Sequence, residues 1–252
     1  MKKHYFFSLI VTALLLSFNG VAQQTTTTER LKELPPGHKI RVKFNSLPPQ
    51  AKAKAEKWLD EITLPDADFN HIRIDDEGGV FYADHFNIDP AEAGSSNSSP
   101  TVSEVTAAEV FTLHSKPGAS RVVHLDFDGH NISGTAWNSG GPTTLYARPY
   151  NSEGSESTFS TTEINEIAAI WHRVAEDYAP FDIDVTTEQP SSYGPNVGHV
   201  LITHRTDSNG NNLYQNPAGG VAYVNVWGYS NYEYYQPCLL YTSPSPRDPL
   251  RY

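Results

Sequence analysis

Histidine and aspartate alternate along one short segment, where His124, Asp126, Asp128 and His130 occupy every second position. On an extended strand these side chains share one face, and imidazole with carboxylate is a ligand set that can hold a divalent cation. The alternative interpretation is a solvated strand face that leads into a turn at Asp128-Gly129. Because Gly129 is expected to break the alternation, His130 need not join the other three residues.

Two further pairs of residues have a spacing that would allow metal binding or acid–base catalysis. His172 and Glu176 stand one helical turn apart, which indicates either half of a zinc site or a hydrogen-bonded pair on a helix surface. Asp182 and Asp184 could act as an acid–base pair of the kind found in glycosidases. The alternation of Phe181-Asp-Ile-Asp-Val185 predicts the same two outward carboxylates without any catalytic role.

Other sequence patterns exclude several chemistries. Asp207-Ser-Asn-Gly-Asn-Asn212 begins like a calcium-binding loop, but Asn212 stands at the sixth position and Ala218 at the twelfth, so a polar turn is expected. The sequence contains no Gly-x-Ser-x-Gly, no P-loop, no dinucleotide-binding glycine pattern and no His-Glu-x-x-His. Cys238 is a poor candidate nucleophile because it begins the irregular stretch 238–252.

Composition limits the class of protein and its partners. Of the 252 residues, 38% are hydrophobic and 19% are charged, which is enough apolar material for a folded core. The net charge of −11 argues against nucleic acid or an anionic membrane surface as a partner. One cysteine excludes an internal disulfide and a cysteine-rich zinc knuckle.

The first 22 residues have the pattern of a cleaved secretory signal peptide. A basic start precedes the predominantly apolar run 5–18, and small residues follow at the positions that a signal peptidase recognises. The run is too short to span a bilayer comfortably. We therefore expect a secreted, extracellular protein of bacterial type, with no membrane association beyond the signal peptide.

Composition divides the rest of the chain into four parts. Residues 23–90 are expected to form a small α/β module, and the small polar residues 91–109 a linker. Residues 110–237 are expected to form a larger domain. Residues 238–252 carry three prolines and no periodicity, and we interpret them as a non-native tail fused to an interrupted reading frame.

Periodicity and capping signals indicate the elements of each part. In the module, Pro48-Pro49 begins a helix with one apolar stripe, and the acidic turn 75–79 joins two strands. In the larger domain, Ser160-Thr-Thr-Glu163 is a capping box that begins a long helix ending at Pro180. The expected strands there are 121–128, 181–185, 200–203 and 221–227. This order predicts an α+β fold with a twisted, partly parallel mixed sheet against the long helix.

Three segments of the larger domain together carry a family resemblance. They are Val123-His-Leu-Asp-Phe-Asp-Gly-His130, Trp171-His-Arg-Val-Ala-Glu-Asp-Tyr-Ala-Pro-Phe-Asp-Ile-Asp-Val-Thr-Thr187 and Gly219-Gly-Val-Ala-Tyr-Val224. In this order and spacing they resemble secreted bacterial zinc metallopeptidases of the metzincin, reprolysin-like type, and the middle segment is the most specific. Residues 27–90 look like the propeptide of such an enzyme.

The resemblance implies a catalytic domain divided by a zinc cleft, in which an edge strand binds a peptide substrate by strand addition. That strand corresponds to Gly220 to Val224, so Gly220, Ala222, Tyr223 and Val224 are the expected substrate-binding residues. Main-chain hydrogen bonds from Ala222 and Val224 would hold the substrate. The implied partner is therefore a protein or peptide.

Zinc is the cofactor that the resemblance implies, held in this family by His-Glu-x-x-His on the helix after the edge strand. Because this sequence lacks the motif, no catalytic residue and no zinc ligand is assigned. We expect the chain to be an inactive N-terminal fragment of a metalloendopeptidase precursor. The module also lacks a cysteine, so latency could not depend on a thiolate bound to zinc; a carboxylate or steric cover is possible.

Two alternatives come from different classes of protein. A non-catalytic secreted module, calcium-binding or adhesive, would use Asp126 and Asp128. A carbohydrate-active enzyme would use the aspartates Asp182 and Asp184. The segment 171–187 favours the peptidase, because strand alternation alone gives no indication of a cleft between the carboxylates.

Overall fold

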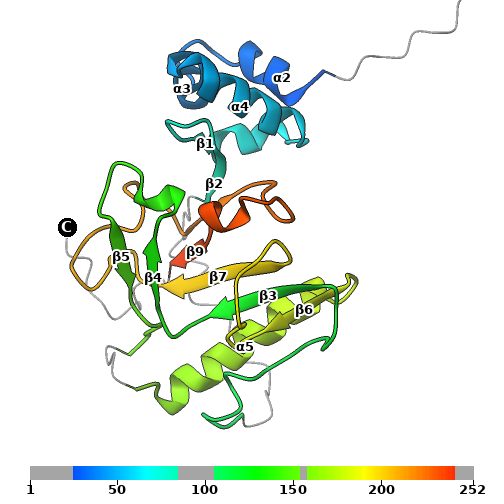
Figure 1. Ribbon diagram of the computed structural model, residues 1–252, viewed down its shortest axis with the longest axis vertical. Helices are drawn as coiled ribbons and strands as arrows, with labels where there is room; N and C mark the ends of the chain where they lie inside the picture. The colour runs from blue at the N-terminus through cyan, green and yellow to red at the C-terminus, as the bar shows by residue number, and fades with distance from the viewer. Residues whose placement is uncertain (1–24, 85–104, 154–157, 242–252) are drawn as a thin grey trace, which may run out of the picture.

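The computed structural model describes residues 25–84, 105–153 and 158–241. Three short helices and two strands form the N-terminal module, and a larger part with one long helix follows (Figure 1). In chain order the elements are α2 (Thr27–Glu33), α3 (Lys39–Ser46), α4 (Pro49–Asp60), η1 (Asp66–Asn70), β1 (Ile72–Ile74), β2 (Val80–Asp84), β3 (Arg121–Asp126), β4 (His130–Ser133), η2 (Ala136–Asn138), β5 (Thr144–Ala147), α5 (Thr161–Tyr178), β6 (Ile183–Thr186), β7 (Val197–Thr203), β8 (Gly220–Tyr223), η3 (Tyr232–Tyr235) and β9 (Cys238–Tyr241).

A seven-stranded sheet runs through both parts of the described chain, in the order β1-β2-β8-β9-β7-β3-β6. Parallel pairing joins β6, β3, β7 and β9, whereas β8 pairs antiparallel with both β9 and β2, and β2 with β1. A separate antiparallel hairpin consists of β4 and β5. The expected α+β fold with a mixed, partly parallel sheet is therefore confirmed at this level.

The long helix α5 covers one face of the parallel strands (Figure 1). The predicted capping box is present: the Glu163 amide donates to the Ser160 hydroxyl, and the Ser160 amide donates to the Glu163 carboxylate. The Trp171 indole N–H donates to the Val185 carbonyl at 2.9 Å, which fixes α5 on β6. The core between helix and sheet includes Val123, Leu125, Phe127, Ile164, Ile167, Ala168, Val185 and Ile202.

The N-terminal module has a core of its own but shares the sheet of the larger part. Helix α3 packs on β1 and α4 on β2, whereas α2 packs on α3 and α4. Their shared core includes Leu31, Phe44, Ala55, Leu59, Phe69 and Ile72. Phe81 and Ala83 of β2 instead belong to the core of the larger part, together with Val221 and Leu239. The two parts that composition separates are thus continuous through the β2–β8 pair.

Besides shifts of up to three residues at the ends of β3, β6 and β7, three features differ from the sequence-based expectation. β8 ends at Tyr223 rather than at Trp227, because Asn225 adopts a left-handed backbone conformation with φ of 56° that cannot continue a strand. The β4–β5 hairpin was not expected. Cys238–Tyr241, the first residues of the stretch interpreted as a non-native tail, form β9 between β7 and β8.

Several predicted segments lie outside the described residues: the signal peptide, most of the linker and the chain beyond Tyr241. Val105, near the end of the predicted linker, packs against the α5 core, and Val110, the first residue of the predicted larger domain, belongs to it. Within the described ranges, none of the helices combines the length and hydropathy that a bilayer-spanning segment needs.

Candidate functional site

The four expected substrate-binding residues lie on β8 or directly after it. Gly220, Ala222 and Tyr223 belong to the strand, and the Val224 amide that follows donates to the Val80 carbonyl at 3.0 Å. Ala222 lies opposite Tyr82 in the β2–β8 register. The main chain that was expected to bind a substrate is therefore paired with β2 of the N-terminal module on one side and with β9 on the other.

Tyrosine hydroxyls reinforce the contact between β8, the residues after it and the module. Three of them donate to module carboxylates: Tyr223 to Asp75 at 2.9 Å, Tyr229 to Glu61 at 2.8 Å, and Tyr234 to Glu77 at 3.0 Å. Burial, followed by the Asp75 charge, raises the pKa of Tyr223, so its hydroxyl stays a donor at all ordinary pH values. Side-chain as well as main-chain bonds therefore hold the module on this strand.

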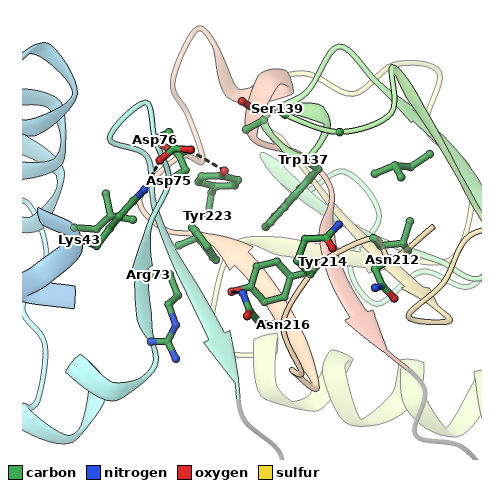
Figure 2. Close-up of a pocket in the computed structure, with 18 of the residues that line it drawn as sticks. Lys43, Arg73, Asp75, Asp76, Trp137, Ser139, Asn212, Tyr214, Asn216 and Tyr223 are labelled. Carbon is green, nitrogen blue, oxygen red and sulfur yellow. Dashed lines mark hydrogen bonds and ion pairs between the residues drawn. The ribbon is translucent and has the colours of Figure 1, made fainter. Parts of the chain in front are cut away.

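A cavity of about 710 Å³ lies beside β2 and β8, between the module and the β4–β5 side of the molecule (Figure 2). Phe81, Trp137, Tyr214 and Tyr223 supply its aromatic wall. Its charged groups come from the module; Lys43 pairs there with Asp76, as Figure 2 shows. An aromatic wall with charges at one side is a surface that could accept side chains of an extended peptide.

A second polar group lies on the sheet face opposite α5. His124 and Asp126 come from β3, and His199 comes from β7, where the parallel register places it directly opposite His124. His199 Nε2 lies 2.7 Å from Asp126 Oδ2, and one ligand atom from each of the three residues lies within 4.8 Å of the others. All three side chains are at most 2% exposed. This buried His-Asp-His group could hold a metal ion.

Tyr193 and His130 border the His-Asp-His group. The Tyr193 ring stacks on His199 with a centroid distance of 4.1 Å, and its hydroxyl shares a hydrogen bond of 2.9 Å with Nδ1 of His124. His130 Nδ1 is 3.8 Å from Asp126 Oδ2. His130, Tyr193 and His199 also line a cavity of about 310 Å³, which gives the buried group a route to the surface.

Burial controls the protonation of this group. It lowers the pKa of His199 to about 3, and, with a smaller contribution from neighbouring His199, that of His124 to about 4. Burial raises the pKa of the Asp126 carboxyl. Both imidazoles are therefore neutral at pH 7, which is the form that coordinates a metal ion.

The structure brings together only part of the predicted His/Asp set. His124 and Asp126 share a face as expected; Asp128 lies beyond the end of β3 and is more exposed, but its carboxyl contacts Asp126, and burial together with this contact raises its pKa to about 6. Gly129 has φ of +89° and breaks the alternation, as predicted, so His130 begins the next strand instead. His199 was missed: its sequence neighbours give no signal, and only the β3–β7 register shows its place.

The other two predicted pairs, on α5 and at β6, do not form a metal-binding or catalytic group in the described residues. His172 and Glu176 are exposed on α5, and no metal-binding group within the described ranges includes them. Asp184 is buried and accepts hydrogen bonds from the amides of Ser115 and Lys116. These bonds hold residues 115–116 against β6. The neighbouring Asp182 is exposed and pairs with Lys116 at 3.0 Å. These contacts account for both aspartates without a catalytic role.

The predicted polar turn at residue 207 is confirmed. One oxygen of the Asp207 carboxylate accepts the amides of Asn209 and Asn211, at 2.9 and 2.7 Å. The other oxygen accepts the Tyr146 amide at 3.2 Å. These bonds lower the pKa of Asp207 despite the opposing effect of burial, and they hold the turn against β5.

Searches of family models, of curated proteins and of solved structures found no match to this chain. The described residues form an α+β protein with a mixed sheet, a strand paired with the N-terminal module, and a buried group that could hold a metal ion.

Proposed function

We propose that this chain is the N-terminal part of a secreted zinc metalloendopeptidase precursor, in which residues 23–90 form the propeptide. The observation that carries the proposal is the β2–β8 pair. The strand that the resemblance assigns to substrate binding is the strand that the N-terminal module occupies. Because the sheet order is β1-β2-β8-β9, removal of the module would leave β8 as a free edge.

A strand that binds an extended peptide offers its main-chain donors and acceptors to the peptide. Here the module satisfies them: Val80 accepts the Val224 amide, and Asp84 accepts the Gly219 amide at 2.7 Å. A peptide could pair with β8 only after these bonds break. Steric cover by β2 is thus a physical basis for latency that needs no thiolate and no metal contact.

The residues of this chain do not fit the catalytic zinc of the family. Its ligands and its general base come from His-Glu-x-x-His, and the sequence contains no such motif. In that family the zinc would activate the water that attacks the peptide bond. This chain itself supplies the substrate-binding strand and the cover of that strand.

The test begins with the reading frame beyond residue 237. We expect the extended protein to carry His-Glu-x-x-His and to hydrolyse casein once residues 23–90 are removed. A chelator should abolish the hydrolysis and zinc should restore it, whereas the 252-residue chain should show no turnover. An extended frame without the motif, or hydrolysis that resists the chelator, would contradict the proposal.

A main-chain variant tests the role of β8 directly. Val224→Pro removes the amide that donates to Val80 here and that would donate to a substrate in the processed enzyme. One lost hydrogen bond of about 1 kcal/mol predicts a several-fold fall in kcat/KM of the extended, processed protein. Ser230→Pro, in an exposed turn, is the matched control. Equal kinetics for the two variants would exclude β8 as the substrate strand.

The alternative of a calcium-binding module has less support from the site. Calcium prefers six to eight oxygen ligands, whereas two of the three buried ligands are imidazole nitrogens. Asp128, the second aspartate of that alternative, contacts Asp126 but is more exposed and is not one of the three buried ligands. The carbohydrate-active alternative is weakened too, since Asp184 is fully engaged by main-chain amides and His114.

A further inference from the structure

The His-Asp-His group contains a buried carboxylate oxygen without a close hydrogen-bond partner. Among the described residues, Oδ1 of Asp126 has no hydrogen bond of normal geometry, although the side chain is only 1% exposed; the Asp128 side chain and the Asp128 and Gly129 amides interact with the carboxylate from farther away. The other oxygen contacts His199 Nε2 at 2.7 Å. Burying a carboxylate with one oxygen unsatisfied costs free energy, which a bound cation would recover.

The ligand atoms identify the class of cation. Two imidazoles and one carboxylate are the set that binds zinc and related divalent transition metals, with ligand distances of about 2.0–2.2 Å. Four-coordinate geometry at these distances separates neighbouring ligand atoms by roughly 3.3 Å. The contact between His199 and Asp126 would therefore lengthen slightly as the ion replaces the hydrogen-bonded proton.

The scaffold around these ligands is rigid and accessible. His124 and His199 lie opposite each other in the parallel β3–β7 pair, so neighbouring strands of one sheet fix two ligands. Tyr193 orients them from outside, by its bond to His124 and its stacking on His199. The cavity lined by His130, Tyr193 and His199 gives a hydrated ion its way in.

We propose that His124, Asp126 and His199 bind one divalent transition-metal ion of the zinc class, which ties β3 to β7. The proposal goes beyond the peptidase assignment and does not depend on it. It concerns residues of this chain alone, so it can be tested without any downstream sequence.

The experiment uses the chain without its predicted signal peptide and without a polyhistidine tag. After chelator treatment and gel filtration, Zn²⁺ or Co²⁺ is added, and bound metal is measured by elemental analysis. Visible absorption of Co²⁺ reports its ligands and geometry. We expect one equivalent of metal, with a Co²⁺ spectrum typical of nitrogen and oxygen ligands in four- or five-coordination.

Variants identify the ligands. Asp126→Asn and His199→Gln should each weaken binding at least 100-fold, whereas His172→Gln, on the exposed face of α5, should retain one equivalent. Tyr193→Phe should weaken binding roughly 10- to 100-fold, as expected of a group that orients a ligand. Binding that survives in both ligand variants would overturn the proposal.

A second measurement covers variants that fail to fold. In the unsubstituted chain, Zn²⁺ should shift the side-chain ¹⁵N resonances of His124 and His199 and leave those of His172 unchanged. Absence of stoichiometric Zn²⁺ and Co²⁺ binding, selective binding of Ca²⁺, or shifts confined to other histidines would each refute the assignment.

Discussion

Alternating side chains make one face of β3 apolar and the other face polar. Along β3, Val123 and Leu125 turn toward α5, and the intervening His124 and Asp126 turn to the other face. Both faces of β3 are buried, yet only the face toward α5 is apolar; farther along the sheet, Leu201 and Leu239 are apolar on the opposite face. A core needs no buried carboxylate for stability, because replacing buried ionic groups by apolar ones is often neutral or favourable. The polar residues on this face therefore suit a ligand better than they suit packing.

At the scale of single residues, His114 makes contacts whose strength depends on pH. Its two ring nitrogens each lie 2.7 Å from a carboxylate oxygen, one of Asp184 and one of Glu188. Burial by itself would lower the pKa of His114, but the hydrogen bonds and charges of the two carboxylates outweigh burial and raise it above 6.5. The contact stabilises the fold fully below pH 6.5 and is lost as the pH rises through the raised folded-state pKa.

We therefore predict that His114→Gln flattens the pH dependence of stability above about pH 6.5. Urea unfolding near pH 6 should show the variant less stable than the unsubstituted chain, and the difference should shrink by about pH 9. Since the site is partly exposed, the loss at the lower pH should be about 1 kcal/mol or less. His172→Gln is the control on α5; a deficit that stays constant across this pH range would exclude this explanation.

A glycine in the β1–β2 turn gives a second prediction at residue scale. Gly78 has φ of +82°, and a Cβ there would collide with the Ala51 carbonyl oxygen of α4. Gly118 has φ of +87°, but a Cβ at that position would meet nothing within 4 Å. A substitution there therefore measures the cost of the strained backbone conformation without a clash. Gly118→Ala should lower the free energy of unfolding by about 1–2 kcal/mol. Gly78→Ala should lower it by about 1–3 kcal/mol more, because of the clash. Equal losses in chemical unfolding would contradict the contact with α4.

Elements with local signals could be predicted from the sequence. The capping box of α5, the apolar stripe of α4 and the alternation of β3 all depend on residues within a few positions of one another. The end of β8 could not be predicted, because nothing in the sequence shows that Asn225 adopts positive φ. The strand β9 could not be predicted for another reason: residues 238–241 become a strand only by pairing with β7 and β8, which are distant in sequence.

The same distinction applies to the candidate sites. His124 and Asp126 could be predicted as one group because strand periodicity places them on one face. His199 stands 73 positions after Asp126 and joins the group through the parallel β3–β7 register, which is a tertiary property. Likewise, the family resemblance indicated β8 as a peptide-binding strand, but only the sheet order shows that β2 occupies it.

The N-terminal cap of α5 gives a prediction at element scale. Ser160 accepts the Glu163 amide at 3.1 Å, and Ser160→Ala removes this acceptor while leaving the rest of the helix unchanged. We expect the free energy of unfolding to fall by about 1 kcal/mol, measured by urea unfolding monitored by circular dichroism. Thr161→Ala, at an exposed neighbouring position, should change stability by less than about 0.5 kcal/mol. Indistinguishable variants would show that the cap contributes nothing.

The whole molecule is held together by the continuity of its sheet. β2 belongs to the module by sequence, but its side chains divide between two cores: Val80 faces the module, and Phe81 and Ala83 face the larger part. The tyrosine–carboxylate bonds cross the same boundary. The module is therefore an integral part of the fold before processing, although the larger part has a second core of its own around α5.

Because β2 contributes to both parts, we predict that the chain unfolds in one cooperative transition. Calorimetry should give equal calorimetric and van't Hoff enthalpies. Phe81→Ala, which removes a side chain only 7% exposed, should lower the free energy of unfolding by about 3–5 kcal/mol without splitting the transition. Val42→Ala, at a position 51% exposed on α3, should cost less than about 0.5 kcal/mol. Two separate transitions, with only the first shifted by Phe81→Ala, would mean that the module folds independently and that β2 is held on β8 too weakly to keep the strand covered.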